Sequence, residues 1–536
     1  MNNSAFCSKH RFFVILILIL MLQLFAALYF CNQKQGFHND EYYSYYSSNV
    51  TYGLTPTDEE WKSTDEIISE FQVAKNERFS YGMVALMQSY DVHPPLYYFI
   101  LHTVCSLTPD IFSKWQGLSV NLVFFILTFI LIAKIAGLLT QGNQKVILSS
   151  CLLYGFSPAV LSGITFIRMY MMLTFFCLLF LYVHCIAIKN DRKTFLGFYL
   201  PVILITYLGF LTHYYFIVFI FFVGISTFFS MLFIKKTRKH ATCYAAMIAG
   251  GLLLAVMSYP ACLSHIFRGY RGTEAQDAFF DLSNIGMRLS FFTNLLNEYL
   301  LAGTFFAMLL IILLLFLTYQ YNHKLSIYHD SQMTAKRRMF SLTLITVTGY
   351  FLIVAKTALL NAEEAIRYEM PVYGLIILLC VILFYQFLFN IGKEGQNRIR
   401  EIVFSVIMLI VLASQIFALS NNKVLFLYED DKENYKWAKE HADESIVYIY
   451  SDTNKWMIWD ESEELMQYKD IYFINMEHNQ IKTDERLKNA NEIYVYAART
   501  PQSENIMKML IKENNKLTSY KKVRELLYCD LYMLYK

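Results

Sequence analysis

The sequence predicts a polytopic α-helical membrane protein with a small α/β domain at its C-terminal end, and three observations predict this class. Of the 536 residues, 56% are hydrophobic and only 17% are charged, and the mean hydropathy is +0.35. A water-soluble chain of this length needs more charge to cover its surface. Apolar runs of the ~20 residues that a helix needs to cross a bilayer recur between residues 12 and 420, and the sequence becomes polar from residue 421 onwards.

Charge and cysteine content narrow the function classes. The 46 Lys and Arg residues nearly balance the 43 Asp and Glu residues, which give a net charge of +3. A protein that binds nucleic acid through its phosphates needs a larger positive excess, so we expect no nucleic-acid partner. Most of the ten cysteines lie in or beside apolar runs without paired spacing, so no disulfide framework is expected. No metal ligand set is indicated, although a divalent metal remains possible, and no cofactor is required.

We expect about eleven membrane spans, with further helices lying at the membrane surface. The first, residues 12–30, follows His10 and Arg11 and is longer than the apolar core of a signal peptide, so we interpret it as an uncleaved helix. The other expected spans are 115–138, 145–165, 170–188, 195–211, 215–234, 241–262, 297–320, 339–360, 371–391 and 401–420.

Residues 94–107 are apolar but too short to cross a ~30 Å core at ~1.5 Å per residue, so we expect a helix at the membrane surface. Counting them as a twelfth span would reverse every later loop and put Lys235 to Lys239 and Lys336 to Arg338 outside, against the positive-inside rule. With eleven spans, the cytoplasmic loops hold Lys145, Lys189, Arg192, Lys193, Lys235, Lys236, Arg238, Lys239, Lys324, Lys336, Arg337, Arg338, Lys393, Arg398 and Arg400.

This topology predicts a cell-membrane protein with a cytoplasmic N-terminus and two domains. Residues 1–420 form the transmembrane domain, with a first outer loop at 32–114, and residues 421–536 form an extracytoplasmic α/β domain. Its expected strands are 445–450, 471–474 and 492–496, and a helix is expected at 505–513. In the first outer loop, Thr57 followed by three acids predicts the start of a helix.

Polar residues that the apolar pattern does not explain gather on the outer loops. Asp40 and Glu41 follow the first span, and His93 precedes two prolines that we expect to open a helix and hold it in the first turn. The other candidates for substrate binding are Tyr97, Arg168, Tyr170, His213, Tyr214, Arg268, Arg271 and Arg367. Each has an ordinary structural explanation, but the topology puts all of them at one membrane surface. Bases and tyrosines there suit a lipid-anchored phosphate, and a carboxylate suits an incoming hydroxyl.

Four motifs, in this order, resemble a known family. They are Asp40-Glu41-Tyr42-Tyr43, His93-Pro94-Pro95-Leu96-Tyr97-Tyr98, Arg168-Met169-Tyr170 and Thr212-His213-Tyr214-Tyr215, with Arg367-Tyr368 as a looser match. Together they resemble the GT-C fold membrane glycosyltransferases of the dolichyl-phosphate-mannose protein mannosyltransferase type (family 39-like), which are related to the bacterial lipid A aminoarabinose transferase. The resemblance covers about residues 1–240; the tail carries no such motif.

The resemblance implies an inverting transfer, on the outer face, of a sugar from a polyprenyl-phosphate donor. Asp40 would be the catalytic base, with Glu41 beside it in the acceptor site, and His93 and Arg168 would lie near the donor phosphate. One carboxylate suffices, because a phosphate leaves without being protonated. Arg168 stands where the aminoarabinose enzymes have an acid, which disfavours an aminoarabinose donor.

The sugar, the prenyl length and the acceptor are left open. The acceptor could be a protein, a lipid or a cell-wall glycopolymer, and the other partner is the lipid bilayer. Two other classes compete with a transferase: a transporter or flippase of a lipid-linked sugar, and a membrane-anchored scaffold for the tail. Mid-span charges and inverted repeats would favour a transporter, and the sequence has neither.

Overall fold

The computed structural model describes residues 3–51, 54–191, 193–234, 237–322, 331–391 and 396–536, and these form two compact units. The helical unit comprises residues 1–32, 88–97 and 117–425. The sheet unit comprises residues 33–87, 98–116 and 426–536. The first outer loop therefore belongs mainly to the same unit as the C-terminal tail. Of the bases that set the predicted orientation, Arg192, Lys235, Lys236, Lys324 and Lys393 lie outside the described residues.

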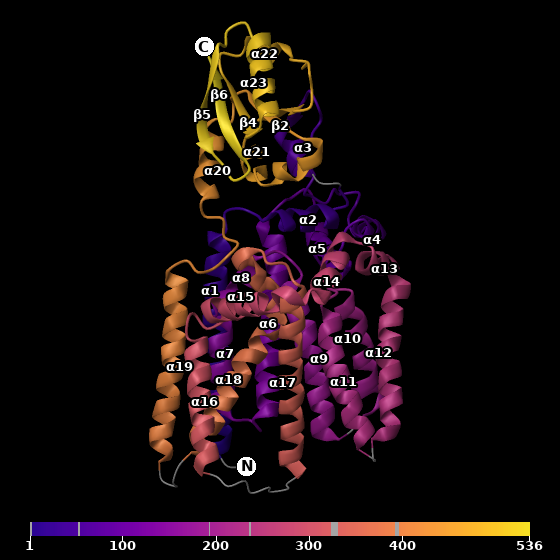
Figure 1. Cartoon of the computed structure of the whole chain (residues 1–536), viewed down its shortest axis with the longest axis vertical. Helices are drawn as coiled ribbons and strands as arrows, with labels where there is room; N and C mark the ends of the chain where they lie inside the picture. Colours follow the sequence, from indigo (N-terminus) through magenta and orange to yellow (C-terminus); the bar gives the residue numbers. More distant parts are fainter. Residues whose placement is uncertain (1–2, 52–53, 192, 235–236, 323–330, 392–395) are drawn as a thin grey trace. The chain divides into compact units, whose positions relative to one another are not determined.

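Long apolar helices make up most of the helical unit, and Figure 1 shows them running side by side. Eight are long and apolar enough to cross a membrane, among the residues described. They are α1 (Asn3–Gln33), α6 (Lys114–Leu139), α9 (Tyr170–Asn190), α11 (Phe216–Phe233), α12 (Arg238–Ser258), α17 (Ser331–Thr357), α18 (Met370–Asn390) with the preceding η4 (Ala362–Glu369), and α19 (Asn397–Ser420). Two bent helix pairs raise the number to ten. The protein is therefore a multi-pass membrane protein.

Ten of the eleven predicted spans correspond to these helices and bent pairs. The other, predicted at 195–211, is the shorter apolar segment made of η1 (Phe195–Tyr199) and α10 (Leu200–Phe210). Residues 94–107, predicted to be a surface helix, form the short apolar helix α5 (Leu96–Leu107). Two short helices, α13 (Ala261–Phe267) and α14 (Tyr270–Phe280), connect α12 to the second bent pair, which begins with η2 (Leu282–Asn284) and α15 (Ile285–Leu295).

The first bent pair consists of α7 (Gln144–Gly155) and α8 (Pro158–Thr165), which meet at 52°. Pro158 lacks the N–H that would continue α7, and it disfavours a helical conformation at the preceding residue. The break frees carbonyl groups of α7 inside an apolar unit, where each must find a donor. Gln23 of α1 donates to the carbonyls of Cys151 and Leu152 (2.9 and 3.0 Å), and Gln415 donates to that of Leu153 (2.9 Å). Two buried glutamines thus stabilise the break.

The second bent pair corrects the span predicted at 297–320. Residues 296–300 form η3 (Leu296–Leu300) at the end of α15, and the crossing helix α16 (Phe305–Asn322) begins only after a 98° bend. Ala302 and Gly303 have φ angles of 48° and 87° at this bend. Glycine adopts this left-handed conformation without a steric penalty, so the helix turns here.

The sheet unit is built on a six-stranded mixed sheet. The strands are β1 (Glu60–Ser63), β2 (Ile446–Tyr450), β3 (Asp470–Asn475), β4 (Ile493–Ala498), β5 (Ser519–Glu525) and β6 (Cys529–Tyr535), in the order β1-β3-β2-β4-β6-β5. β2 is parallel to β3 and to β4, whereas β1, β5 and β6 pair antiparallel with their neighbours. The helices are α2 (Asn39–Ser48), α3 (Thr64–Ser69), α4 (Tyr81–Ser89), α20 (Asp431–Glu440), η5 (Asp452–Trp459), α21 (Ser462–Leu465), α22 (Glu485–Asn489) and α23 (Pro501–Glu513).

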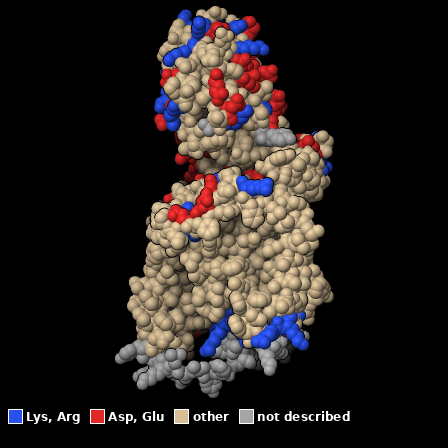
Figure 2. Space-filling model, turned by 45° about the vertical axis from the view of Figure 1, so that its right-hand side comes forward, with Lys and Arg blue, Asp and Glu red and all other residues tan. Residues whose placement is uncertain are grey.

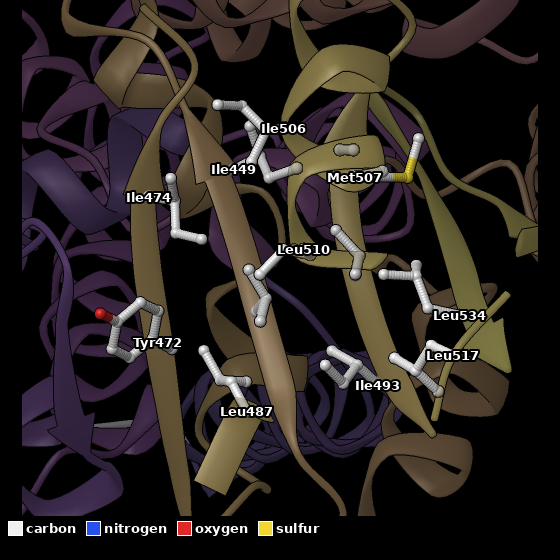
Figure 3. Close-up of a cluster of buried hydrophobic side chains, with 13 residues drawn as sticks. Ile449, Tyr472, Ile474, Leu487, Ile493, Ile506, Met507, Leu510, Leu517 and Leu534 are labelled. Carbon is white, nitrogen blue, oxygen red and sulfur yellow. The ribbon is translucent and has the colours of Figure 1, made fainter. Parts of the chain in front are cut away.

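The three strands and the helix predicted in the tail are confirmed, and the core lies between them. Alternate residues of β2 and β4 point to one face, where α23 packs its apolar side. Figure 3 shows Ile449 and Ile493 from the strands facing Ile506 and Leu510 from α23. Each of these four side chains is at least 98% buried.

The helix predicted from Thr57 is wrong. Residues 60–63 instead form β1, which pairs with β3, so Glu60 lies opposite Phe473 and Ser63 opposite Asp470. The helix starts at Thr64, because Ser63 accepts from the amide of Glu66 and Glu66 accepts from that of Ser63, a capping box. Residues 60–63 pair with β3 and form an edge strand of the sheet. Local sequence preferences cannot predict a pairing between two segments that are about 400 residues apart in the sequence.

Candidate functional site

In the helical unit, His93 and Arg168 lie together, as the sequence predicts. Nη2 of Arg168 is 3.3 Å from Nε2 of His93, and the Arg168 side chain is buried. Nδ1 of His93 donates to Oδ2 of Asp91 (3.0 Å), which also accepts from Nε2 of Gln88 (2.6 Å). Burial alone would raise the pKa of Asp91, but the charge and hydrogen bond of His93, with the charge of Arg168, hold this pKa well below its usual range.

The position of His93 differs in one respect from the sequence prediction. Helix α5 begins at Leu96, after the two prolines, so His93 lies in the preceding bend and not in the first turn. Proline disfavours the helical conformation for the residue before it, and Pro94 therefore excludes His93 from the helix. The amide of Leu96 donates to the carbonyl of Leu211 (2.9 Å), which fixes this bend against the end of α10.

His213 joins the same cluster from the turn between α10 and α11. Its ring centroid is 6.0 Å from that of His93 and 5.5 Å from that of Tyr170. Burial, with the charges of His93 and Arg168, lowers the pKa of His213 well below its usual value. Because Nδ1 accepts from the amide of Tyr215 (3.0 Å), the neutral ring carries its proton on Nε2. His213 is thus a hydrogen-bond donor that adds no charge beside Arg168.

Tyr214, the neighbour of His213, begins a chain of hydrogen bonds that leads to Ser89. Its hydroxyl donates to Nδ1 of His265 in α13 (2.9 Å), and Nε2 of His265 donates to the carbonyl of Ser89 (3.1 Å). Burial lowers the pKa of His265, which fits a neutral ring used in this way. The chain from Tyr214 to Ser89 holds the turn at His213 and the bend at His93 in one arrangement.

Aromatic rings extend the cluster toward η4. Tyr368 lies 5.8 Å from Tyr170 and 6.1 Å from Tyr215, centroid to centroid. Arg367 is buried; its guanidinium lies 5.1 Å from the centroid of Phe166, and Nη2 is 3.4 Å from the Tyr368 hydroxyl. The looser motif match at Arg367-Tyr368 therefore lies beside the cluster.

Three predicted binding residues are more loosely related to this cluster. Tyr97 is fully buried in the first turn of α5. Arg268 is exposed after α13, and Arg271 is exposed in α14, where it forms an ion pair with Glu274 (3.0 Å). The structure places neither arginine in a buried pair with Arg168.

Asp40 and Glu41 lie in the sheet unit, in the first turn of α2. His38 caps this helix: its ring accepts from the amide of Asp40 (3.0 Å), and Glu41 accepts from the amide of His38 (2.6 Å). These bonds form a capping box in which His38 takes the place of Ser or Thr. The Asp40 side chain remains 33% exposed, whereas that of Glu41 is fully buried. The two adjacent acids are therefore in different environments.

Glu41 also forms an ion pair with Lys34. The pair is buried (2.8 Å), and Lys34 also donates to the carbonyl of Phe426 (2.7 Å). Both charged side chains have no exposed surface. Together they join the end of α1, the start of α2 and the start of the C-terminal tail within the sheet unit.

Replacing Glu41 by Gln is expected to lower the free energy of unfolding of the sheet unit by about 3–5 kcal/mol, because Lys34 stays buried without its counter-charge. All five tryptophans (Trp61, Trp115, Trp437, Trp456 and Trp459) belong to this unit, so urea unfolding in mild detergent can be followed by their fluorescence. Glu66→Gln is the control, since Glu66 has the same place in the exposed capping box of α3. Equal losses in the two variants would contradict a special role for the buried pair.

Carboxyl groups near α2 bind their protons unusually tightly. Burial raises the pKa of Asp431 to about 6, of Asp460 to about 7 and of Glu463 to about 8. The hydroxyl of Tyr42 donates to Oε2 of Glu463 (2.5 Å), which partly opposes this rise. Part of the surroundings of α2 therefore gains negative charge as the pH rises through neutrality.

This cluster predicts a falling stability of the sheet unit between pH 6 and pH 8. The unfolded carboxyls titrate near pH ~4, so the folded state binds more protons above this pH. The contribution of these three carboxyl groups to the free energy of unfolding is complete below pH ~4 and is lost as the pH rises through about 6 to 8. Thermal unfolding followed by tryptophan fluorescence from pH 5 to 9 should show a falling midpoint, and a less steep one in Glu463→Gln. A midpoint that rises across this range would refute the assignment; Glu485→Gln, on the exposed start of α22, is the control.

The described part of the chain shows no arrangement of side chains typical of a metal-binding site. There, no group of three or more His, Cys, Asp or Glu side chains is arranged to hold a metal ion. Asp91, His93 and His213 contact or adjoin Arg168, whose positive charge disfavours a cation among them.

Comparisons with known proteins bear on the fold. No protein-family model matches the sequence, and no curated protein matches it. Among solved structures, ArnT from Cupriavidus metallidurans bound to undecaprenyl phosphate matches with a TM-score of 0.51 at 10% identity, over 96% of this chain and 97% of ArnT. This match extends over nearly the whole of both chains, and ArnT, a lipid A aminoarabinose transferase, is a GT-C fold enzyme.

The chain has the GT-C fold. ArnT in its apo state matches with a TM-score of 0.44 at 10% identity, over 91% of this chain and 95% of that one. An oligosaccharyltransferase from Archaeoglobus fulgidus, in complex with Zn and sulfate, gives a TM-score of 0.47 at 11% identity, over 88% of this chain and 67% of its own. The match to ArnT bound to undecaprenyl phosphate confirms the expectation of a GT-C fold drawn from the four motifs.

Within this GT-C chain, sequence reasoning passed over three residues of the cluster. Asp91 stands two residues before His93, and that spacing in a turn made rigid by prolines was a usable signal for an orienting carboxylate. Tyr215 belongs to the Thr212-His213-Tyr214-Tyr215 motif, which was the available signal for it. Glu369 is fully buried after Arg367, and neither carboxylate oxygen has a hydrogen-bond partner among the described residues. A Glu directly before the apolar run that begins at Met370 was the available signal for it.

Proposed function

We propose that the protein is an inverting glycosyltransferase that moves a sugar from a polyprenyl-phosphate donor to a hydroxyl group of an acceptor. The observation that carries the proposal is the buried guanidinium of Arg168, in contact with His93 at the start of the spanning helix α9. The guanidinium is a charged donor that is fixed in place next to His93 and near Tyr170 at the membrane boundary. Charged donors of this kind form strong hydrogen bonds to phosphate oxygens, so a phosphate is the anion that this place suits best.

The surroundings of Arg168 suit a phosphate that leaves during the reaction. The proton on Nε2 of neutral His213 can donate to a phosphate oxygen without competing for charge, and Arg367 adds a second buried guanidinium. Donors fixed before the reaction stabilise the charge that develops on a leaving group at little cost of rearrangement. The undecaprenyl phosphate bound by ArnT, which shares the GT-C fold, supports a polyprenyl-phosphate ligand here.

In this proposal Asp40 is the base. Its carboxylate is partly exposed, so an acceptor hydroxyl can reach it, whereas Glu41 is buried in the pair with Lys34. Asp40 takes the hydroxyl proton while the hydroxyl oxygen forms a bond to the anomeric carbon. The bond from that carbon to the phosphate oxygen breaks, and polyprenyl phosphate leaves with the electron pair. Glu41 positions Asp40 through the capping box and does not itself accept the proton.

The positive-inside pattern supports a reaction on the outer face, with the N-terminus in the cytoplasm and residues 421–536 outside. The acceptor would then be a protein, a lipid or a cell-wall glycopolymer exposed on that face.

A conversion assay in detergent separates this proposal from a transporter. Purified wild-type protein is incubated with the glycosylated polyprenyl phosphates and envelope polymers extracted from membranes of the source cells, and the lipids are analysed by mass spectrometry. We expect glycosylated polyprenyl phosphate to be converted to polyprenyl phosphate. A transporter or flippase leaves every lipid mass unchanged, because in detergent there are no leaflets to exchange, and that result would overturn the proposal.

A further inference from the structure

A cavity of about 1330 Å³ lies in the helical unit, between the ends of helices α6 and α9, the end of α11 and the start of α17. Its lining includes Gly137 of α6, Lys189 of α9, Ser226 of α11 and Lys336 of α17. The candidate donor site lies near Tyr170, at the other end of α9. The 21 residues of this helix separate the two places by roughly 30 Å at ~1.5 Å per residue. The cavity is therefore distinct from the donor site.

The charge of the lining is strongly one-sided. Among the described residues of the lining, the charged ones are Asp191 and five bases: Lys189, Lys193, Lys336, Arg337 and Arg338. Neither Lys189, Lys336, Arg337 nor Arg338 forms an ion pair with another described residue. Figure 2 shows Lys and Arg side chains gathered at this lower end of the helical unit, below a broad surface almost without charge. Such a group of bases attracts an anion.

The rest of the lining combines hydroxyl groups with apolar walls. Ser226, Thr227, Ser230 and Ser341 supply hydroxyls, and Ile188, Met231, Leu342 and Ile345 supply apolar surface. A small free anion needs the first kind of lining but not the second. The volume also exceeds the ~300–1,000 Å³ of typical small-molecule sites. The cavity can thus hold a charged group together with an apolar extension.

We propose that this cavity binds the phosphate headgroup of an anionic phospholipid from the adjacent leaflet. The bases and hydroxyls hold the phosphate, and the apolar walls receive the first part of the acyl chains. The cavity lies at the ends of spanning helices, the level at which headgroups meet the hydrocarbon, and Lys and Arg side chains reach that level readily. The positive-inside pattern makes this the cytoplasmic leaflet, which is rich in anionic lipids. The inference does not depend on the proposed transferase activity.

Native mass spectrometry of the full chain in mild detergent, titrated with phosphatidylglycerol, tests this site. The double variant Lys189→Gln/Lys336→Gln removes two bases from the lining. The control Lys239→Gln/Arg398→Gln removes two exposed bases at the starts of α12 and α19, which do not line the cavity. Ser226→Phe fills the cavity and leaves every charge in place. Far-UV circular dichroism verifies that each variant keeps its helices, and size-exclusion chromatography verifies that it does not aggregate.

We expect the lining variant to bind phosphatidylglycerol more weakly by a factor of about ten or more. Ser226→Phe should lose the tightest-bound lipid, and the control should match the wild type. Binding that falls equally in the control would show a diffuse charge effect and overturn the cavity as the site. Displacement of the lipid by millimolar inorganic phosphate would assign the lining to a soluble anion and overturn the lipid. Unchanged binding in both Ser226→Phe and the lining variant would also overturn it.

Discussion

Asp40→Asn is expected to slow sugar transfer by about 100-fold to 10,000-fold, because an amide cannot accept the proton of the acceptor hydroxyl. The conversion of glycosylated polyprenyl phosphate in detergent measures this loss. The variant should still bind the donor, since the residues that we propose to hold the phosphate belong to the helical unit. Protein purified from source cells should therefore carry the glycosylated lipid, whose mass identifies the sugar.

Asp65→Asn is the matched control for this prediction. Asp65 is the second residue of α3, as Asp40 is of α2, and each helix begins with a capping box. Loss of a first-turn carboxylate affects both helices alike, so only the catalytic role differs between the two variants. Turnover retained in Asp40→Asn, or equal losses in the two variants, would remove Asp40 from its role as base.

Arg168→Ala is expected to lower turnover by about 100-fold to 1,000-fold, the range found when a fixed donor to a developing oxyanion is removed. The physical reason is the loss of the guanidinium that, in the proposed mechanism, stabilises the charge on the leaving phosphate. Arg168→Lys should recover part of the rate, because it restores the charge but not the planar pair of donors. Rates are measured with the same conversion assay.

Arg400→Ala controls for the loss of a buried arginine in the helical unit. Arg400 is 8% exposed and donates to the carbonyl of Phe389 (3.1 Å) in α18. It belongs to the opposite end of the spans from Arg168, so we expect nearly wild-type turnover. A loss equal to that of Arg168→Ala would mean that burial of the charge, and not contact with phosphate, explains both results.

Much of the helical unit could be predicted from the sequence, because membrane spans are set by length and hydropathy. What hydropathy could not show was where helices break. Pro158 ends α7 inside an expected span, and Ala302-Gly303 turns the chain where a straight helix was expected. The glutamines that stabilise the first break are more than 100 residues away in sequence, so only the folded chain reveals their purpose.

The candidate site was predictable in part. Topology alone brought His93, Arg168 and His213 to one surface, and the structure joins them. The different environments of Asp40 and Glu41 were hidden, because the partner of Glu41 is Lys34, a residue at the end of the first span with no motif. The strand at residues 60–63 was also hidden, since its pairing partner β3 lies in the C-terminal tail.

Native mass spectrometry of the wild type and Arg168→Ala, purified from source cells in mild detergent, tests the central claim most directly. We predict that the wild type carries a polyprenyl phosphate or its glycosylated form, that Arg168→Ala has lost it, and that Arg400→Ala retains it. Wild-type protein without any such lipid, or an Arg168→Ala variant that keeps it, would contradict the assignment of Arg168 to the donor phosphate.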